Sequence, residues 1–256
     1  MNIVVCAKLV PDPEDIEIGS DGSVSLEKAD WMIGEYDLQA IEAGVRLVEA
    51  RGGKLIALSA GPSQINTSKL KKDLLSRGPD ELYLVVDDSL RDADTSVIAS
   101  VLAAAITKLG QVDLVLCGEG SADLYFQQVG LQLGERLGWP TFNAISKIEA
   151  RDGKLLVERS LEDEVELLEL PLPAALSVTT DINTPRLPTM KMILLATKKT
   201  ITQVIINDLG VKLENQVEII SIKAPYRVTR KQVRITGTSE DAARALVGYF
   251  CREGVL

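Results

Sequence analysis

The alternation of apolar runs with segments of helical periodicity in the first half of the chain is the feature that most constrains its fold. Four short apolar runs are typical of strands: IVVCAKLV (3–10), KLIALSAG (54–61), ELYLVVDD (81–88) and DLVLCG (113–118). Segments with helical periodicity separate them, at 37–53, 66–78 and roughly 93–109, and the first two end at glycine. Repeated strand–helix units predict a parallel sheet that is covered by helices on both faces.

The pattern changes after a further expected helix at 124–137, which ends at Gly138-Trp139-Pro140. Residues 144–178 resemble a β-meander with Asp152–Gly153 as a hairpin turn, and 175–178 could return to the main sheet. Residues 190–199 could form a helix, and residues 200–256 carry shorter, less periodic pieces and a final helix. We therefore expect an α/β domain over 1–199, including the meander at 144–178, and a C-terminal arm over 200–256 that docks on a partner subunit.

The composition excludes several classes of function. The 256-residue chain has a net charge of −9 without a basic cluster, which argues against a nucleic-acid partner. No apolar run approaches the roughly 18 residues of a membrane span. Three widely separated cysteines form no CxxC motif and suit a reducing cytoplasm. The absence of histidine removes the commonest general base and metal ligand, so any redox chemistry needs an organic cofactor.

Ligands of parallel sheets bind beyond the carboxyl ends of the strands, at a switch point in strand order. The segment GEGSADLYFQQVG (118–130) follows a strand there and leads into a helix, an arrangement whose free backbone N–H groups can hold a phosphate. It contains Glu119 and Asp123 but no lysine. Two interpretations stay open: Asp123 simply caps the next helix, or Gln127, Gln128 and the backbone amides hold a phosphate. The chain has neither a GxGxxG nor a GxxxxGK[ST] motif.

Four segments in consistent order and spacing resemble the beta subunit of electron transfer flavoproteins over essentially the whole chain. They are CAKLVPD (6–12), SAGP (59–62), VERSLEDEVELLELPLPAALS (157–177) and DINTPRLPTMKMILLATKK (181–199). The resemblance implies a doubly wound, mostly parallel sheet of the adenine-nucleotide α-hydrolase-like type, with the β-meander as an insertion and an extended C-terminal arm.

The resemblance also implies a heterodimer with an alpha subunit, which holds most of an FAD that carries electrons. The donor would be a dehydrogenase, of the acyl-CoA type, and the acceptor a quinone oxidoreductase or a ferredoxin. The chain would have no catalytic residues of its own and would bind a nucleotide, either AMP or the ADP part of a second FAD. By position, the walls of that pocket would be Cys6, Ala7, Lys8, Gly34, Glu35, Tyr36, Asp37, Ala60, Gly118, Ser121, Asp123, Gln127, Gln128, Val129 and Gly130.

The loop at 118–130 departs from both of the family's better-known patterns. Phe126 stands where electron-bifurcating members have a threonine, and Gln127-Gln128-Val129-Gly130 replaces the Asn-Gln-Thr-Gly of AMP-binding members. The amino-acid sequence of the loop is most similar to that of the Fix-type branch. A bifurcating component with a second FAD is therefore the alternative, and a nucleotide-binding stress or regulatory protein is an alternative of another class. Met190 corresponds to the apolar anchor of the family's dehydrogenase-recognition loop, although a core role is equally open for it.

Overall fold

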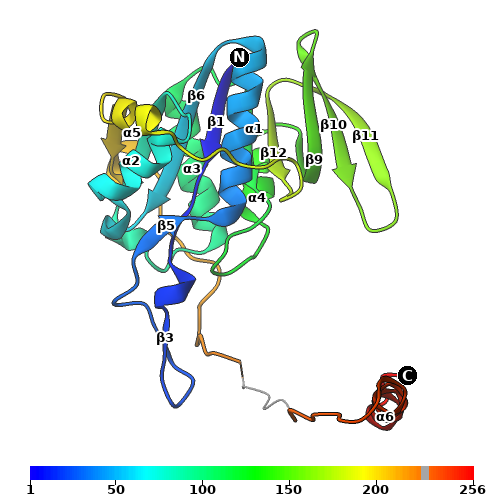
Figure 1. Ribbon diagram of the computed structural model, residues 1–256. Coiled ribbons are helices and arrows are strands. Elements are labelled where there is room, and N and C mark those ends of the chain that lie inside the picture. The colour runs from blue at the N-terminus through cyan, green and yellow to red at the C-terminus, as the bar shows by residue number, and fades with distance from the viewer. Residues whose placement is uncertain (226–230) are drawn as a thin grey trace.

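The computed structural model describes residues 1–225 and 231–256. Its main feature is a nine-stranded sheet in the order β11-β10-β9-β12-β8-β1-β6-β7-β13 (Figure 1). The strands that pair in parallel are β1 (Asn2–Cys6), β6 (Lys54–Gly61), β7 (Glu81–Val86), β8 (Leu114–Gly118), β9 (Thr141–Arg151), β12 (Ala174–Val178) and β13 (Thr200–Val204). This arrangement confirms the predicted mostly parallel sheet.

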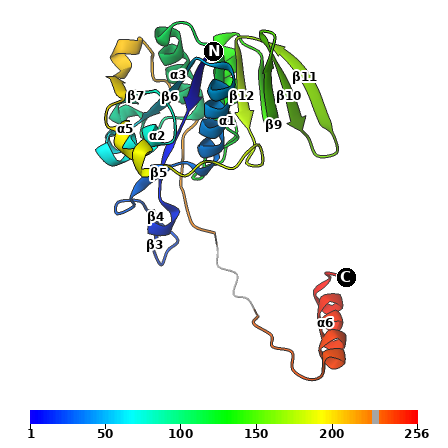
Figure 2. The same cartoon turned by 45° about the horizontal axis from the view of Figure 1, so that its top comes forward.

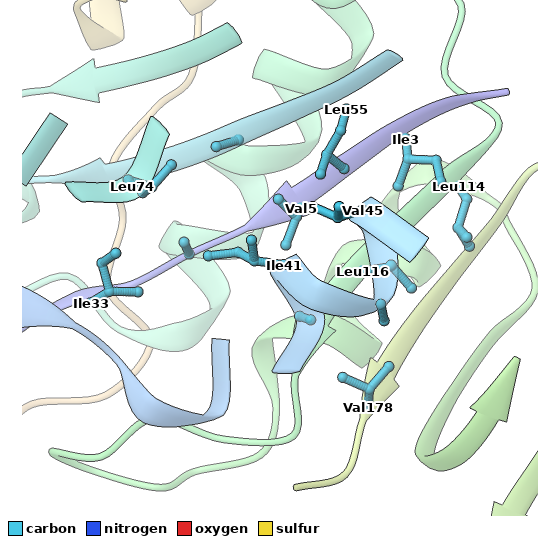
Figure 3. Packing of buried hydrophobic residues seen from close by; sticks show 14 of the residues in the cluster. Ile3, Val5, Ile33, Ile41, Val45, Leu55, Leu74, Leu114, Leu116 and Val178 are labelled. Carbon is cyan, nitrogen blue, oxygen red and sulfur yellow. The ribbon is translucent and has the colours of Figure 1, made fainter. Parts of the chain in front are cut away.

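Helices cover both faces of the sheet because successive residues of each strand point to opposite sides. Ile3 and Val5 of β1 pack with α1 (Glu35–Arg51) and α2 (Ser68–Ser76), as Figure 3 shows for part of this core. Val4 and Cys6 pack on the other side with α3 (Thr95–Leu109) and α4 (Val129–Leu137). Two apolar cores on one sheet are the mark of a doubly wound α/β fold.

The strand order places the switch point at β1. From β1 the chain crosses to β6 and then β7 on one side, and later to β8 and β12 on the other. Ligands of such sheets bind beyond the carboxyl ends of the strands at the switch point, which here are the ends of β1 and β8. Short 3₁₀ turns follow the ends of β6 and β7, at Ser63–Ile65 and Asp88–Leu90.

The meander forms as predicted and extends the sheet at one edge. β9 (Thr141–Arg151), β10 (Lys154–Ser160) and β11 (Val165–Pro171) pair antiparallel, and β12 then returns beside β8. Asp152 and Gly153 both have positive φ angles, of 49° and 78°. That is the combination a two-residue hairpin turn requires, and it confirms this turn.

The segment between β1 and α1 forms two small hairpins that the periodicity did not reveal. β2 (Leu9–Pro11) pairs with β5 (Trp31–Ile33), and β3 (Glu17–Ile18) pairs with β4 (Val24–Ser25). A 3₁₀ turn at Pro13–Asp15 lies between them. Strands of two or three residues are too short to carry a visible alternation, so only the pairing itself defines them.

The predicted helix at 124–137 is wrong in its first turn. α4 begins at Val129, because Tyr125 and Gln127 have φ angles of 49° and 57° that no α-helix contains. The predicted helix at 190–199 is shorter, since α5 spans Met190–Ala196 and is capped by the Thr189 side chain.

The predicted boundary at residue 200 also lies too early. β13 pairs in parallel with β7, and the following 3₁₀ turn (Ile206–Leu209) packs against α3 with Ile206 buried. Val211 and Leu213 pack against the same core, and hydrogen bonds hold residues 215–217 and Ala224 to the body. The chain ends in α6 (Ser239–Glu253), which Figures 1 and 2 show set apart from the body and in which no described residue is buried.

Candidate functional site

Asp37, near the start of α1, joins the ends of the two strands at the switch point. Its Oδ2 accepts a hydrogen bond from the Lys8 backbone N–H just beyond β1, at 2.6 Å. Its Oδ1 accepts one from the Gly118 backbone N–H at the end of β8, at 3.2 Å. The Lys8 carbonyl in turn accepts from the Gly34 N–H at 2.9 Å. One buried side chain therefore fixes the spacing of three of the predicted wall segments.

Burial gives this carboxyl group an unusual acidity. Asp37 is 6% exposed, and loss of hydration raises its pKa to about 7. Hydrogen bonds from the Lys8 and Gly118 amides favour the charged form but only partly offset this effect. The strand ends are thus held by a group that changes its charge near neutral pH.

Gly118 is needed where β8 meets the start of α1. A Cβ atom at this position would lie 2.7 Å from the Tyr36 carbonyl carbon and 2.8 Å from Asp37 Oδ1. Real Cβ atoms do not approach other atoms this closely, so only glycine lets strand and helix come together here.

The loop after Gly118 folds back over the strand ends. Lys8 Nζ forms an ion pair with both oxygens of Asp123, at 2.7 and 2.6 Å, and the rings of Tyr36 and Tyr125 lie 5.1 Å apart. The Tyr125 N–H donates to the Ser121 carbonyl at 3.0 Å. Asp123 therefore does not cap α4, and the helix-cap interpretation is wrong.

The acidic residues that looked awkward for a phosphate site are already engaged. Burial alone would raise the pKa of Asp123, but the Lys8 ammonium outweighs it and the pKa is lowered. The charge of Asp123 is therefore neutralised by Lys8. Burial raises the pKa of the Glu119 carboxyl, which reduces its tendency to ionise.

The glutamine end of the loop turns toward α3. Gln128 Oε1 accepts a hydrogen bond from Thr95 Oγ1 at 2.9 Å, and Gln132 Nε2 donates to the same hydroxyl at 3.3 Å. Gly130 lies against β12 and β8, where an added Cβ would be 2.1 Å from Ser177 Oγ. Thr95 was not anticipated, because nothing in its local sequence indicates that it faces the loop.

The structure brings most of the predicted wall residues to one edge of the sheet. The ends of β1 and β8, the start of α1 and the loop meet there through the contacts just described, and Ala60 lies near the end of β6, beside β1. Residues 127–130 continue from this edge to α3 and β12. Met190 lies elsewhere, as the first residue of α5, which packs on α2, and it is 73% exposed. A core role for Met190 is therefore wrong.

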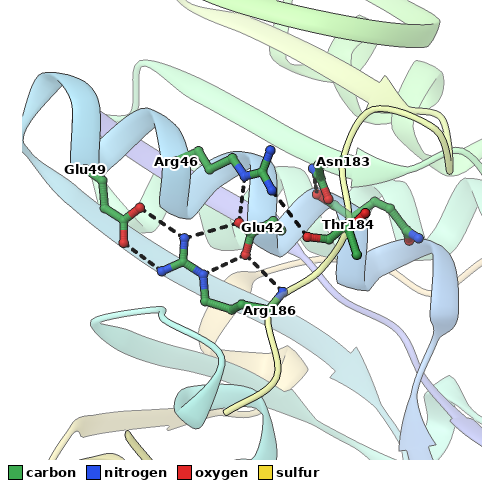
Figure 4. A network of polar contacts seen from close by, with 7 residues as sticks. Glu42, Arg46, Glu49, Asn183, Thr184 and Arg186 are labelled. Atoms are coloured by element: carbon green, nitrogen blue, oxygen red, sulfur yellow. Dashed lines mark hydrogen bonds and ion pairs between the residues drawn. The ribbon is translucent and has the colours of Figure 1, made fainter. Parts of the chain in front are cut away.

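A second polar network joins α1 to the segment before α5. Arg186 donates through Nε to Glu42 Oε2 at 2.7 Å and through Nη1 to Glu49 Oε1 at 2.6 Å, while Arg46 also binds Glu42 (Figure 4). Burial alone would raise the pKa of Glu42, but the two arginines lower it. The network fixes residues 181–189 across α1 and so positions α5. Sequence reasoning found the segment but not this role, because Glu42 and Arg186 are 144 residues apart.

A pocket of about 280 Å³ lies at the opposite edge of the sheet, near the start of β6, and is lined by Val45, Leu55, Asp80, Arg186 and Lys199 among others. Its charged groups already have partners. Arg186 binds Glu42 and Glu49, Asp80 accepts from the Leu55 N–H, and Lys199 Nζ donates to carbonyls of residues 75, 78 and 79. We place the candidate ligand site at the carboxyl edge because the switch point in strand order lies there.

Polar and aromatic groups gather at the carboxyl edge. They include the Gln127 and Gln128 side chains and two tyrosine rings, while the Lys8 and Gly118 amides bind Asp37 and the Lys8 ammonium pairs with Asp123. Among residues 1–225 and 231–256, no cluster of His, Cys, Asp or Glu could hold a metal ion. Within the same residues no helix has the length and apolar character that a membrane crossing requires.

Comparison with known protein families agrees with this geometry. The family model of the electron transfer flavoprotein domain matches residues 22–209. The matched region contains α1 with Asp37, the loop after β8, the meander and the segment anchored by Arg186. It covers well over half of the chain, and the chain therefore belongs to the electron transfer flavoprotein domain family.

Proposed function

We propose that this chain is the beta subunit of a heterodimeric electron transfer flavoprotein. The alpha subunit would hold most of the FAD, and the pair would carry electrons from a dehydrogenase, of the acyl-CoA type, to a quinone oxidoreductase or a ferredoxin. FAD supplies the redox chemistry when bound, and the protein positions it and sets its electrostatic surroundings. The Fix-type branch and a cytoplasmic location stay predictions.

The observation that carries this proposal is the meeting of β1, α1 and β8 through Asp37. It fixes the ends of β1 and β8 at the switch point, and the loop of residues 119–128 lies over them. At this edge Gln127 and Gln128 would contact phosphate oxygens, and Lys8 would do so on exchanging Asp123 for a phosphate. Tyr36 and Tyr125 would offer apolar surface to a base. The chain would bind and orient the nucleotide without transferring a proton.

Two exposed apolar surfaces support a partnership with other proteins. Leu187, Met190 and Leu194 are each more than 60% exposed around α5, on the segment that Arg186 fixes. Val217, Ile219, Ile220 and Ile222 are exposed along the arm beyond Leu209. Side chains of this kind are rarely left in water in such groups. We propose that the α5 surface meets the dehydrogenase, with Met190 as its anchor, and that the arm docks on the alpha subunit.

The test is the nucleotide content of the chain after co-expression with its alpha partner. A yellow heterodimer that releases FAD and AMP on denaturation supports the proposal. Release of FAD alone, in excess over one per heterodimer, would favour the bifurcating alternative. A colourless chain that is stable by itself and releases no nucleotide would refute the proposal.

A further inference from the structure

The first turn of α3 contacts two parts of the molecule that are far apart in the sequence. On one side it binds the loop after β8, and on the other side it binds the root of the C-terminal arm, residues 211–217. Both sets of contacts are made by side-chain hydrogen bonds of defined geometry. Neither contact is needed to form α3 itself.

Asp94 makes the contacts with the arm. Its Oδ1 caps α3 by accepting from the Val97 N–H at 2.8 Å. Its Oδ2 accepts from the backbone N–H groups of Gln216 and Val217. Burial alone would raise the pKa of Asp94, but these amide hydrogen bonds outweigh it and lower the pKa, so the group is charged at neutral pH. Bonds from backbone amides to a charged acceptor are stronger than those between neutral groups.

Asn215 reinforces the same contact from the arm. Its Oδ1 accepts from the Asp94 N–H at 3.0 Å, and its Nδ2 donates to the Asp92 carbonyl at 3.0 Å. Residues 215–217 are therefore joined to residues 92–94 by four hydrogen bonds. Farther along the arm, the Ala224 N–H donates to the Gly22 carbonyl at 2.9 Å.

Thr95, the neighbour of Asp94, makes the contacts with the loop. Its hydroxyl donates to Gln128 Oε1 at 2.9 Å and accepts from Gln132 Nε2 at 3.3 Å. Next in sequence, Ser96 Oγ accepts from Arg136 of α4 at 2.7 Å. Asp94 and Thr95 are adjacent in the chain, so the hydrogen bonds of the loop and those of the arm meet at one point of the backbone.

We propose that Asp94 is a positioning residue that couples nucleotide binding at the loop to the placement of the C-terminal arm. This coupling rests on the proposed function, because it requires that the loop of residues 119–128 binds a nucleotide. A nucleotide that holds Gln128 lowers the cost of ordering the α3 turn, and the ordered turn then holds the arm root better. By linkage, release of the arm must weaken nucleotide binding by the same factor by which the nucleotide strengthens the arm contact.

Two variants release the arm from opposite sides. In Asp94→Asn the helix cap is kept, because asparagine caps helices about as well as aspartate, but an uncharged side chain faces the two arm amides. Asn215→Ala removes two of the hydrogen bonds and leaves α3 untouched. Thr67→Ala is the matched control, because Thr67 caps α2 at the Leu70 N–H and, within residues 1–225 and 231–256, forms no hydrogen bond with the arm or the loop.

The experiment measures AMP binding by calorimetry and hydrogen exchange of residues 211–217 in the full-length chain. The chain is purified with its partner subunit, stripped of nucleotide and titrated with AMP. We expect Asp94→Asn and Asn215→Ala each to weaken AMP binding by about five- to twentyfold, which is the lower part of the usual range of such coupling. In the wild type, AMP should slow hydrogen exchange of residues 211–217. Thr67→Ala should have the AMP affinity of the wild type and show the same slowing of exchange.

Two results would overturn the coupling, and they are distinguishable. If the wild type binds AMP and both arm variants bind it within about twofold of the wild type, the coupling is refuted while the pocket stands. If AMP does not bind to the stripped wild-type complex at all, the AMP pocket itself fails and the coupling with it. Should Asp94→Asn not fold, Asn215→Ala decides the first case alone.

Discussion

The pKa of Asp37 leads to a prediction about stability that can be worked out from the structure. The ordinary pKa of an aspartate is 3.8, and burial raises the pKa of Asp37 to about 7. The folded protein therefore holds this proton more tightly than the unfolded chain. Its contribution to stability is fully present below pH 3.8 and is lost as the pH rises through 7.

The magnitude follows from the two pKa values. The full loss is about 4 kcal/mol, since each pKa unit corresponds to about 1.36 kcal/mol. Between pH 5 and pH 8, where other carboxylates stay ionised, linkage gives a loss of about 2.5 kcal/mol. Asp37→Asn removes this dependence, because asparagine has nearly the shape of a protonated aspartate and cannot ionise.

The assay is urea unfolding followed by the fluorescence of Trp31 and Trp139, with wild type and variant in the same subunit composition. The stability of Asp37→Asn relative to the wild type should rise by about 2.5 kcal/mol from pH 5 to pH 8. Asp88→Asn is the control, because Asp88 is an exposed aspartate whose pKa is lowered by Ser63. The stability of Asp88→Asn relative to the wild type should therefore stay constant between pH 5 and pH 8. A relative stability of Asp37→Asn that changes by less than about 0.5 kcal/mol over this range would refute the reasoning.

Three further substitutions test the contacts around the site. Arg186→Ala should lower the free energy of unfolding by about 1–3 kcal/mol, because Glu42 stays buried with one partner fewer, and an unchanged urea midpoint would contradict this. Gly118→Ala should cost about 1–3 kcal/mol by overpacking against α1, whereas Gly248→Ala, whose added Cβ meets nothing within 4 Å, should cost nothing in the same urea titration. Gln128→Glu should weaken AMP in calorimetry through charge repulsion, and unchanged AMP affinity would mean that this side chain does not face a phosphate.

The sequence was sufficient for those parts of the fold that local pattern determines. The strands at 54–61 and 113–118, the helix that ends at the Gly52–Gly53 pair and the Asp152–Gly153 turn are each specified by a few consecutive residues. Periodicity and turn chemistry act over that range, so these predictions were confirmed.

Other parts depend on residues that are distant in the sequence. The irregular turn at Tyr125–Gln127 is composed of ordinary helix-compatible residues, and Gly118, Tyr36 and Lys8 hold its loop from outside. β13 seemed part of a tail because its five residues gain stability only from pairing with β7. Local propensity cannot report such contacts.

The location of the site stays a prediction, and the sequence did not reveal the contacts that hold this edge of the sheet together. Position within the family placed Asp37 in the pocket wall, yet its carboxylate bonds to the Lys8 and Gly118 amides. Likewise, Asp123 was expected either to cap a helix or to line the nucleotide pocket, and its carboxylate pairs with Lys8. Which atoms a carboxylate meets is decided by the three-dimensional arrangement of strand ends, which no single stretch of sequence contains.

The most direct test of the proposed function is the spectrum and nucleotide content of the full-length chain purified with its alpha partner. The proposal predicts a yellow heterodimer with the absorbance of bound flavin, from which denaturation releases FAD together with AMP. Loss of AMP, but not of FAD, from a Gln128→Glu heterodimer would assign the AMP to the loop after β8. A colourless complex, or a chain that forms no complex and releases no adenine nucleotide, would contradict the proposal.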